Sequence, residues 1–156
     1  MKIVGDGGHA KVVRQVIKAR YLGFDLGSQF AFIAIGDNSD RKKEAVMAEA
    51  SGCKFPVLIH PSAVVDPSAK IGEGTVIMAG AVIQADAVIG KHCILNSCCS
   101  VDHDCVLGDY VHIAPGAHLC GGVKVGEGTL VGVGSRAVPG AVIGSWGLLR
   151  AGETAR

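Results

Sequence analysis

The sequence lacks the features that mark several large classes of protein. Its 156 residues carry a net charge of +1 and no basic run, so nothing predicts nucleic-acid binding. No stretch approaches the roughly twenty apolar residues of a membrane span, and Met1 to Val4 shows no sign of a signal peptide. The six cysteines lack CxxC spacing. We therefore expect a cytoplasmic protein with reduced thiols, no nucleic-acid partner and no membrane insertion.

What the sequence does have is a strict six-residue repeat from Ile59 to Gly144. A branched aliphatic residue stands at every sixth position without insertion, and a small or β-branched residue stands two positions before each. Helices repeat every 3.6 residues and strands every two, so neither accounts for a period of six. A hexapeptide β-helix does, with both kinds of residue pointing into a narrow core. The aliphatic positions are Ile59, Val65, Ile71, Ile77, Ile83, Ile89, Leu95, Val101, Leu107, Ile113, Leu119, Val125, Val131 and Ile143, with Ala137 the exception.

A second, longer period of eighteen residues is superimposed on the six-residue repeat. A branched aliphatic residue followed by glycine recurs at 71–72, 89–90, 107–108, 125–126 and 143–144. Three hexapeptides therefore form one triangular coil, and about five coils stack about 4.8 Å apart. The recurring glycine predicts a corner whose backbone conformation other residues resist. The repeat does not fix the handedness of the helix. Cys93, Cys99 and Cys105 fall at small inward positions and are predicted to be core residues.

The residues ahead of the repeat predict a small α/β unit. Lys2 to Val4 is apolar, Gly5 to Ala10 reads G-x-G-x-x-A, and Lys11 to Arg20 has helical spacing. A strand, glycine loop and helix in this order can turn backbone N–H groups toward a phosphate, although a tight turn gives the same pattern. We divide the chain into residues 1–55, the α/β unit, and residues 56–156, the β-helix.

A second strand and helix complete the α/β unit. Phe30 to Ile35 predicts a strand, and a helix capped by Ser39 or Asp40 follows it to about Ala50. Loops after parallel strands hold ligand contacts in doubly wound sheets, which makes this loop a candidate nucleotide contact. The alternative is a solvated turn and helix cap. The candidate residues are Gly36, Asp37, Asn38 and Arg41.

Five motifs, in this order, resemble those of the hexapeptide acyltransferases. The closer resemblance is to the sialic acid O-acetyltransferase and nucleotide-amino-sugar N-acetyltransferase group. It implies a left-handed parallel β-helix of about five coils behind a Rossmann-like α/β domain. That domain is shortened here, because relatives carry a further strand–helix–strand portion where Tyr21 to Gln29 stand. The motifs are Gly5–Val13, Ala34–Asn38 with Arg41, Ile59–Ala63, Asp102–Asp104 and Asp109–Pro115.

The same resemblance implies an acetyl-CoA-dependent acetyltransferase without a metal. It would act on a UDP-linked amino sugar for surface glycan or exopolysaccharide synthesis, as a homotrimer with active sites between subunits. The implied sugar-nucleotide contacts are Gly7, Gly8, His9, Gly36, Asn38 and Arg41. The implied coenzyme contacts are His112, Gly121, Gly122 and Ala137.

The chemistry is expected at Asp102-His103-Asp104. His103 comes two residues after the inward Val101, so it lies at a corner, where a histidine titrates near neutrality. A flanking carboxylate can fix its tautomer; the resemblance favours Asp104 over Asp102. Gly121, eighteen residues on, should occupy the same corner one coil along, where its N–H could donate to a thioester carbonyl. The alternatives are a surface histidine and a glycine pair that only relieves a tight corner.

Direct N-acetyl transfer with His103 as general base is the predicted function. O-acetyl transfer to sialic acid or another glycan would use the same parts, and a non-catalytic scaffold would use none of them. A zinc site like that of γ-type carbonic anhydrases needs three converging imidazoles. His103, His112 and His118 share no eighteen-residue offset, so we expect no metal.

Overall fold

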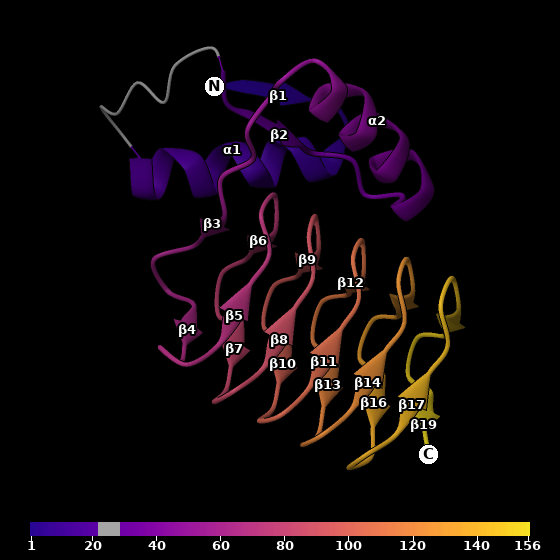
Figure 1. The fold of residues 1–156 in the computed structure, drawn as a ribbon. Coiled ribbons are helices and arrows are strands. Elements are labelled where there is room, and N and C mark those ends of the chain that lie inside the picture. The colour runs from indigo at the N-terminus through magenta and orange to yellow at the C-terminus, as the bar shows by residue number, and fades with distance from the viewer. Residues whose placement is uncertain (22–28) are drawn as a thin grey trace.

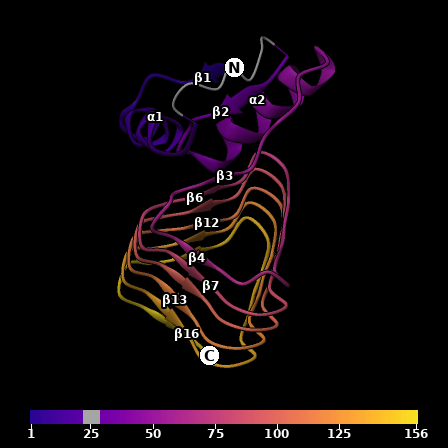
Figure 2. The ribbon, with the colours of Figure 1, turned by 90° about the vertical axis from the view of Figure 1, so that its left-hand side faces the viewer.

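The β-helix predicted from the six-residue repeat is present. The computed structural model describes residues 1–21 and 29–156, and two-residue strands run from β3 (Leu58–Ile59) to β19 (Thr154–Ala155). They form three parallel sheets, which make the sides of a triangular prism (Figure 2). The strands between are β4 (Val64–Val65), β5 (Lys70–Ile71), β6 (Val76–Ile77), β7 (Val82–Ile83), β8 (Val88–Ile89), β9 (Ile94–Leu95), β10 (Ser100–Val101), β11 (Val106–Leu107), β12 (His112–Ile113), β13 (His118–Leu119), β14 (Lys124–Val125), β15 (Leu130–Val131), β16 (Arg136–Ala137), β17 (Val142–Ile143) and β18 (Leu148–Leu149).

Each strand pairs in parallel with the strand one coil away. Ser100 of β10 lies opposite Val82 of β7 on one side and His118 of β13 on the other, an offset of eighteen residues each way. Three hexapeptides therefore make one coil, as predicted. The inward residues of the central coils are buried, and Cys93, Cys99 and Cys105 are at most 1% exposed. Burial raises the pKa of the Cys93 and Cys99 thiols to about 12, which keeps them protonated.

The glycines at the eighteen-residue period have a different role from the predicted one. A Cβ on Gly72 would come within 2.5 Å of the Gly90 carbonyl, and one on Gly90 within 2.6 Å of the backbone of Asp109. These glycines therefore allow successive coils to approach closely; their own φ angles are not positive. The left-handed conformation occurs instead three residues after each inward aliphatic. From Gly74 to Gly152 it falls on glycines and on Asp86, His92, Cys98, Asp104, Tyr110 and Trp146.

The α/β unit consists of β1 (Lys2–Val4), α1 (Gly8–Tyr21), β2 (Ala31–Ile33) and α2 (Asn38–Ala50) (Figure 1). β1 and β2 form a two-stranded parallel sheet. The second strand is shorter than predicted. The predicted cap of α2 is wrong, because Asp37 caps the helix: its Oδ1 accepts from the Asp40 N–H at 2.9 Å. The segment where relatives carry their extra portion lies mostly outside the described residues.

The α/β unit covers one of the three sheets of the β-helix, and both views place it on the same side (Figures 1 and 2). The outward residues Leu58, Val76 and Ile94 are at most 1% exposed, and they share a buried cluster with Ala10 and Val13 of α1. The division between residues 55 and 56 stays a prediction, because the two parts share this cluster. Within the described ranges, no helix is long and apolar enough to cross a bilayer.

Candidate active site

His103 and Asp104 form a hydrogen-bonded pair at the corner between β10 and β11. Nδ1 of His103 lies 2.7 Å from Oδ2 of Asp104, and each side chain is 66% exposed. A carboxylate accepts, so Nδ1 carries the proton and the lone pair of Nε2 is left free. This hydrogen bond to Asp104 raises the pKa of His103 above its ordinary value. The pair therefore offers an exposed, oriented nitrogen base.

Gly121 lies against the His103 ring, one coil along the β-helix. A Cβ on Gly121 would be 2.6 Å from both Nε2 and Cε1 of His103, and the Gly122 N–H donates to the His103 carbonyl at 2.9 Å. The Gly121 N–H has no hydrogen-bond partner in the described part of the chain. A free base nitrogen and an unused backbone donor therefore lie beside the same patch of surface.

A second group of predicted residues surrounds a cavity of about 410 Å³ in the α/β unit. Its lining includes the loop from Gly5 to His9 and the segment from Ala34 to Gly36. Gly7 and Gly8 leave the loop backbone uncovered, with nothing within 4 Å of a Cβ placed on either. His9 Nε2 is buried without a partner among the described residues. Burial and the nearby Arg41 lower the pKa of His9 to about 4, so a neutral imidazole adjoins the cavity.

Arg41 is held at the junction by internal hydrogen bonds, and its predicted contact with a ligand stays a prediction. The side chain is 1% exposed, and its guanidinium donates to five backbone carbonyls and to one side-chain amide oxygen. These acceptors use every N–H of the group. Asn38 is engaged as well, because its Nδ2 donates to the Gly128 carbonyl at 2.9 Å. The acceptors of Arg41 are the carbonyls of Ile35, Gly36, Asp37, His92 and Tyr110 and Oδ1 of Asn38.

Ala137 and His112 are two of the predicted coenzyme contacts, and their contact with a coenzyme stays a prediction. Ala137 occupies an inward position and is 0% exposed, so its side chain belongs to the core. The Nε2 of His112 lies 3.1 Å from Asn96 Nδ2. Burial lowers the pKa of His112 to about 4. Of the two ring nitrogens, Nε2 is paired with the Asn96 amide, and the side chain is half-buried.

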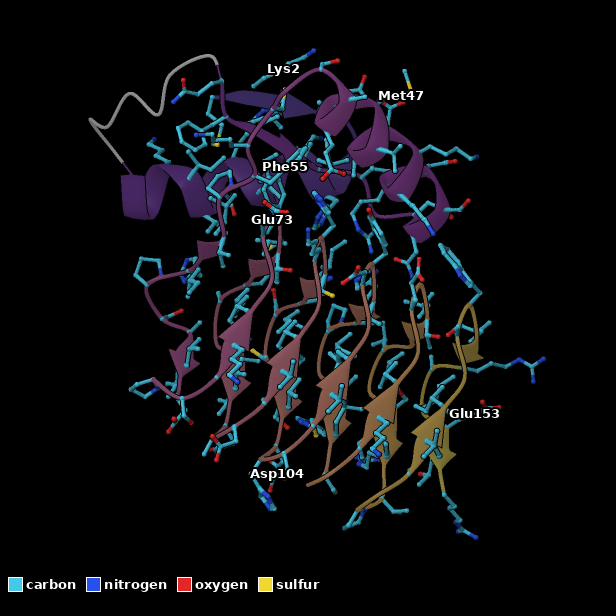
Figure 3. All side chains as sticks on the ribbon, viewed as in Figure 1. Lys2, Met47, Phe55, Glu73, Asp104 and Glu153 are labelled. Atoms are coloured by element: carbon cyan, nitrogen blue, oxygen red, sulfur yellow. The ribbon has the colours of Figure 1, made fainter. Side chains whose placement is uncertain are left out.

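The two predicted groups do not meet within one chain. The glycine loop belongs to the α/β unit at one side of the prism, whereas Asp104 lies at the opposite edge of the β-helix (Figure 3). A site that uses both groups needs either a second copy of the chain or a ligand that spans the prism.

Sequence reasoning missed an aromatic cluster at the junction. The His92 ring stacks on Tyr110 with centroids 5.4 Å apart and meets the edge of Phe55 at 4.7 Å. Lys42 Nζ lies 5.7 Å from the Tyr110 centroid and 5.3 Å from that of Trp146. Tyr110 follows His92 by eighteen residues and Trp146 follows it by fifty-four, both multiples of the coil length, and this was the signal that could have placed these side chains at one corner.

Three comparisons with known proteins agree with this architecture. The family described as bacterial transferase hexapeptide (six repeats) matches residues 68–103, 86–121 and 104–137. The acetyltransferase domain of PglB from Neisseria gonorrhoeae FA1090, in complex with acetyl coenzyme A, is 37% identical with a TM-score of 0.90; the match covers 97% of this chain and 87% of that one. PerB from Caulobacter crescentus, in complex with CoA and GDP-perosamine, is 40% identical with a TM-score of 0.91, covering 97% and 86%.

A curated relative matches a shorter region. The UDP-N-acetylbacillosamine N-acetyltransferase of Bacillus subtilis (strain 168) is 43% identical over 94 residues, covering 40% of this chain and 44% of that protein. The chain thus matches less than half the length of this relative. The fold and the repeat define a hexapeptide-repeat transferase with a left-handed β-helix. Within that class, the chain belongs to the hexapeptide-repeat sugar N-acetyltransferases.

Proposed function

We propose that this chain is an acetyl-CoA-dependent N-acetyltransferase that acts on the amino group of a nucleotide-linked sugar in the cytoplasm. The observation that carries the proposal is the corner where His103 Nε2 lies beside the unused N–H of Gly121. The names of the relatives support the substrates: one is a UDP-sugar N-acetyltransferase, and PerB is bound to CoA and GDP-perosamine. A UDP-linked amino sugar for surface glycan or exopolysaccharide synthesis is our first choice, and a GDP-linked one the second.

The corner residues suit a direct transfer. His103 Nε2 takes a proton from the sugar amine as the amine nitrogen attacks the thioester carbonyl carbon. The Gly121 N–H donates to the oxygen, on which negative charge develops. The C–S bond then breaks, and the proton held by His103 passes to the departing thiolate of coenzyme A. Asp104 keeps Nδ1 protonated and stabilises the imidazolium that forms between these steps.

The position of the glycine loop favours a homotrimer with active sites between subunits. The cavity beside His9 belongs to the α/β unit, whereas the corner with Asp104 lies at the opposite edge of the β-helix (Figure 3). In a cyclic trimer, the corner of one copy can face the α/β unit of the next. The glycine loop would then hold the diphosphate of the sugar nucleotide while the sugar amine reaches the neighbouring His103.

O-acetyl transfer to sialic acid or another glycan is the second candidate, because the same base and oxyanion donor would serve a hydroxyl group. A zinc enzyme would need three converging imidazoles; within residues 1–21 and 29–156 of one chain, no three His, Cys, Asp or Glu side chains gather where a metal could bind. A scaffold without activity would leave the pairing of His103 with Asp104 unexplained.

The test is thiol release from acetyl-CoA with a panel of UDP- and GDP-linked amino sugars and with sialic acids. The proposal expects release with at least one nucleotide amino sugar and an N-acetyl product by mass spectrometry. An O-acetyl product, or acetylation of sialic acid alone, would select the second candidate. No release with any acceptor would contradict both and favour the scaffold.

A further inference from the structure

Trp146 is the single tryptophan of the chain, and its indole lies flat on Gly128 of the preceding coil. A Cβ added to Gly128 would lie 2.6 Å or less from Cδ2, Cε3 and Cε2 of Trp146. These three atoms belong to one six-membered ring, and a point that is this close to all of them lies over the face of the ring rather than beside its edge. Glycine is therefore what allows the indole to rest on the backbone.

Hydrogen bonds fix the backbone on both sides of this contact. The Gly128 N–H donates to the Asp109 carbonyl at 2.8 Å, and the Gly128 carbonyl accepts from Asn38 Nδ2 at 2.9 Å. The Trp146 N–H donates to the Glu127 carbonyl at 2.7 Å. Trp146 also has a φ of 55°, which a bulky side chain rarely adopts. The backbone that carries the indole and the backbone beneath it are therefore ordered before any ligand binds.

The second face of the indole borders a cavity of about 660 Å³, a size typical of small-molecule sites. The side chain of Trp146 is 48% exposed although Gly128 covers one face, so the exposed surface includes the other face. The opposite wall is one side of α2, formed by residues three or four positions apart. Val46 and Met47 of this wall are 51% and 63% exposed. The α2 residues in the wall are Ser39, Lys42, Lys43, Val46 and Met47.

Two lysines of α2 bring positive charge to this cavity. Lys42 Nζ lies 5.3 Å from the indole centroid and 2.6 Å from Glu127 Oε1. Lys43 Nζ lies 3.0 Å from Asp40 Oδ1. Exposed ion pairs of this kind are weak, so either ammonium group can turn to a phosphate instead. The cavity therefore combines an aromatic face, an apolar wall and cations that suit a phosphate.

This cavity adjoins the space beside the glycine loop through a smaller cavity of about 230 Å³. Ser39 and Trp146 line both the large cavity and the smaller one. Gly36 lines both the smaller cavity and the cavity of about 410 Å³ beside the glycine loop. The three cavities therefore follow one another along the start of α2, and the cavity at Trp146 is at one end of the row.

We propose that the cavity between Trp146 and α2 binds the base of a nucleotide, stacked on the free face of the indole. Bases of every kind stack on aromatic side chains, because each has a π-face. The inference rests on the proposed function for its ligands, since acetyl-CoA and a nucleotide-linked sugar both carry a base and phosphates. The two sources share this chemistry, and the experiment distinguishes them. Trp146 holds the base and takes no part in the proton transfer at His103.

The fluorescence of the single tryptophan reports this contact without any activity. The protein would be titrated with CoA, UDP and GDP, and with pantetheine and ribose 5-phosphate, which lack a base. We expect saturable quenching by at least one of the first three ligands and none by the last two. Quenching by CoA alone would identify the base as adenine of the coenzyme, and quenching by UDP or GDP alone would identify it as the base of the sugar nucleotide. Quenching by both kinds would support a platform that accepts either.

Three results of this titration would overturn the inference. The first is no quenching by any nucleotide. The second is equal quenching by pantetheine or ribose 5-phosphate, which would show that the base is not what binds. The third is an emission that changes with protein concentration and with no nucleotide, which would assign the cavity to a second copy of the chain.

A variant of the opposite wall tests the location of the site. Met47→Glu on α2 (Figure 3) leaves the tryptophan in place and adds a carboxylate that repels a phosphate. We expect the ligand concentration for half-maximal quenching to rise about tenfold. Val133→Glu is the matched control, because Val133 is similarly exposed, at 56%, and lies outside the lining of this cavity; its titration should match that of the wild type. Equal titrations of Met47→Glu and the wild type would overturn the inference.

Kinetics test the consequence for the reaction. Trp146→Leu removes the stacking face, so the KM for the substrate whose base quenches the fluorescence should rise about tenfold, with kcat unchanged. Thermal unfolding would show that the variant is folded. An unchanged KM in the folded variant would overturn the inference. If no acceptor is acetylated, the proposed function fails, while the fluorescence titrations still decide whether a nucleotide binds at Trp146.

Discussion

The histidines at the junction and the histidine at the corner differ in every property that matters for proton transfer. At the junction, burial lowers the pKa of His9, His92 and His112 to about 4. At the corner, Asp104 raises the pKa of His103, whose side chain is 66% exposed. The comparison teaches that the same side chain is held neutral where it is buried and becomes a base where it is exposed beside a carboxylate.

The largest expected effect is the loss of the corner base. His103→Ala removes the proton acceptor, and we expect kcat to fall about a thousandfold, with an unchanged unfolding temperature because the side chain is exposed. Thiol release and thermal unfolding would measure the two quantities. A reduction of less than tenfold would assign the base to another residue and remove the distinction between the two regions.

Removing Arg41 should lower the stability of the fold, in contrast to the removal of His103. Arg41→Met leaves several buried carbonyls without donors, so we expect a loss of about 3 kcal/mol in the free energy of unfolding. Urea unfolding followed by circular dichroism would measure it. Lys43→Met, at an exposed side chain of the same helix, is the control and should cost less than about 0.5 kcal/mol. Equal stability of the two variants would contradict the structural role of Arg41.

Lowering the pH should reduce the stability of the protein first at the junction between the α/β unit and the β-helix. The unfolded chain protonates its histidines near pH 6.5, whereas the folded chain resists protonation of His9, His92 and His112 down to about pH 4. Stability is therefore complete above about pH 6.5 and falls as the pH drops toward 4, by at most about 3 kcal/mol per histidine. His92→Phe should reduce this slope in unfolding experiments at several pH values. An unchanged slope would show that His92 is not held neutral.

The smallest expected effect tests the close packing of Gly121 against the His103 ring at the corner. Gly121→Ala places a Cβ where the His103 ring now lies, so the imidazole must shift; we expect kcat to fall about tenfold with little loss of stability. Gly144→Ala is the matched control, because nothing lies within 4 Å of its Cβ. Full activity in Gly121→Ala would show that Gly121 has no part in the reaction.

The β-helix could be predicted from the sequence because its period of six is enforced by a narrow core at every coil. The same register placed Gly121 beside His103, since both residues occupy one corner eighteen residues apart. The junction could not be predicted in this way. Arg41, His92 and His112 come together through the docking of the α/β unit, which no period in the sequence encodes. The ligand contacts predicted for Arg41 and His112 stay predictions.

The central claim is that His103 of one copy works on a substrate held by the glycine loop of another. Two inactive variants test it: His103→Ala, and Gly8→Glu, which places a carboxylate at the cavity where the loop has room for it. Equal amounts of the two would be unfolded and reassembled together. If each site takes its base and its loop from different copies, about one quarter of the sites are intact in random mixtures, and about one quarter of wild-type thiol release returns. No recovery in mixed assemblies, shown to form by mass spectrometry, would contradict the claim.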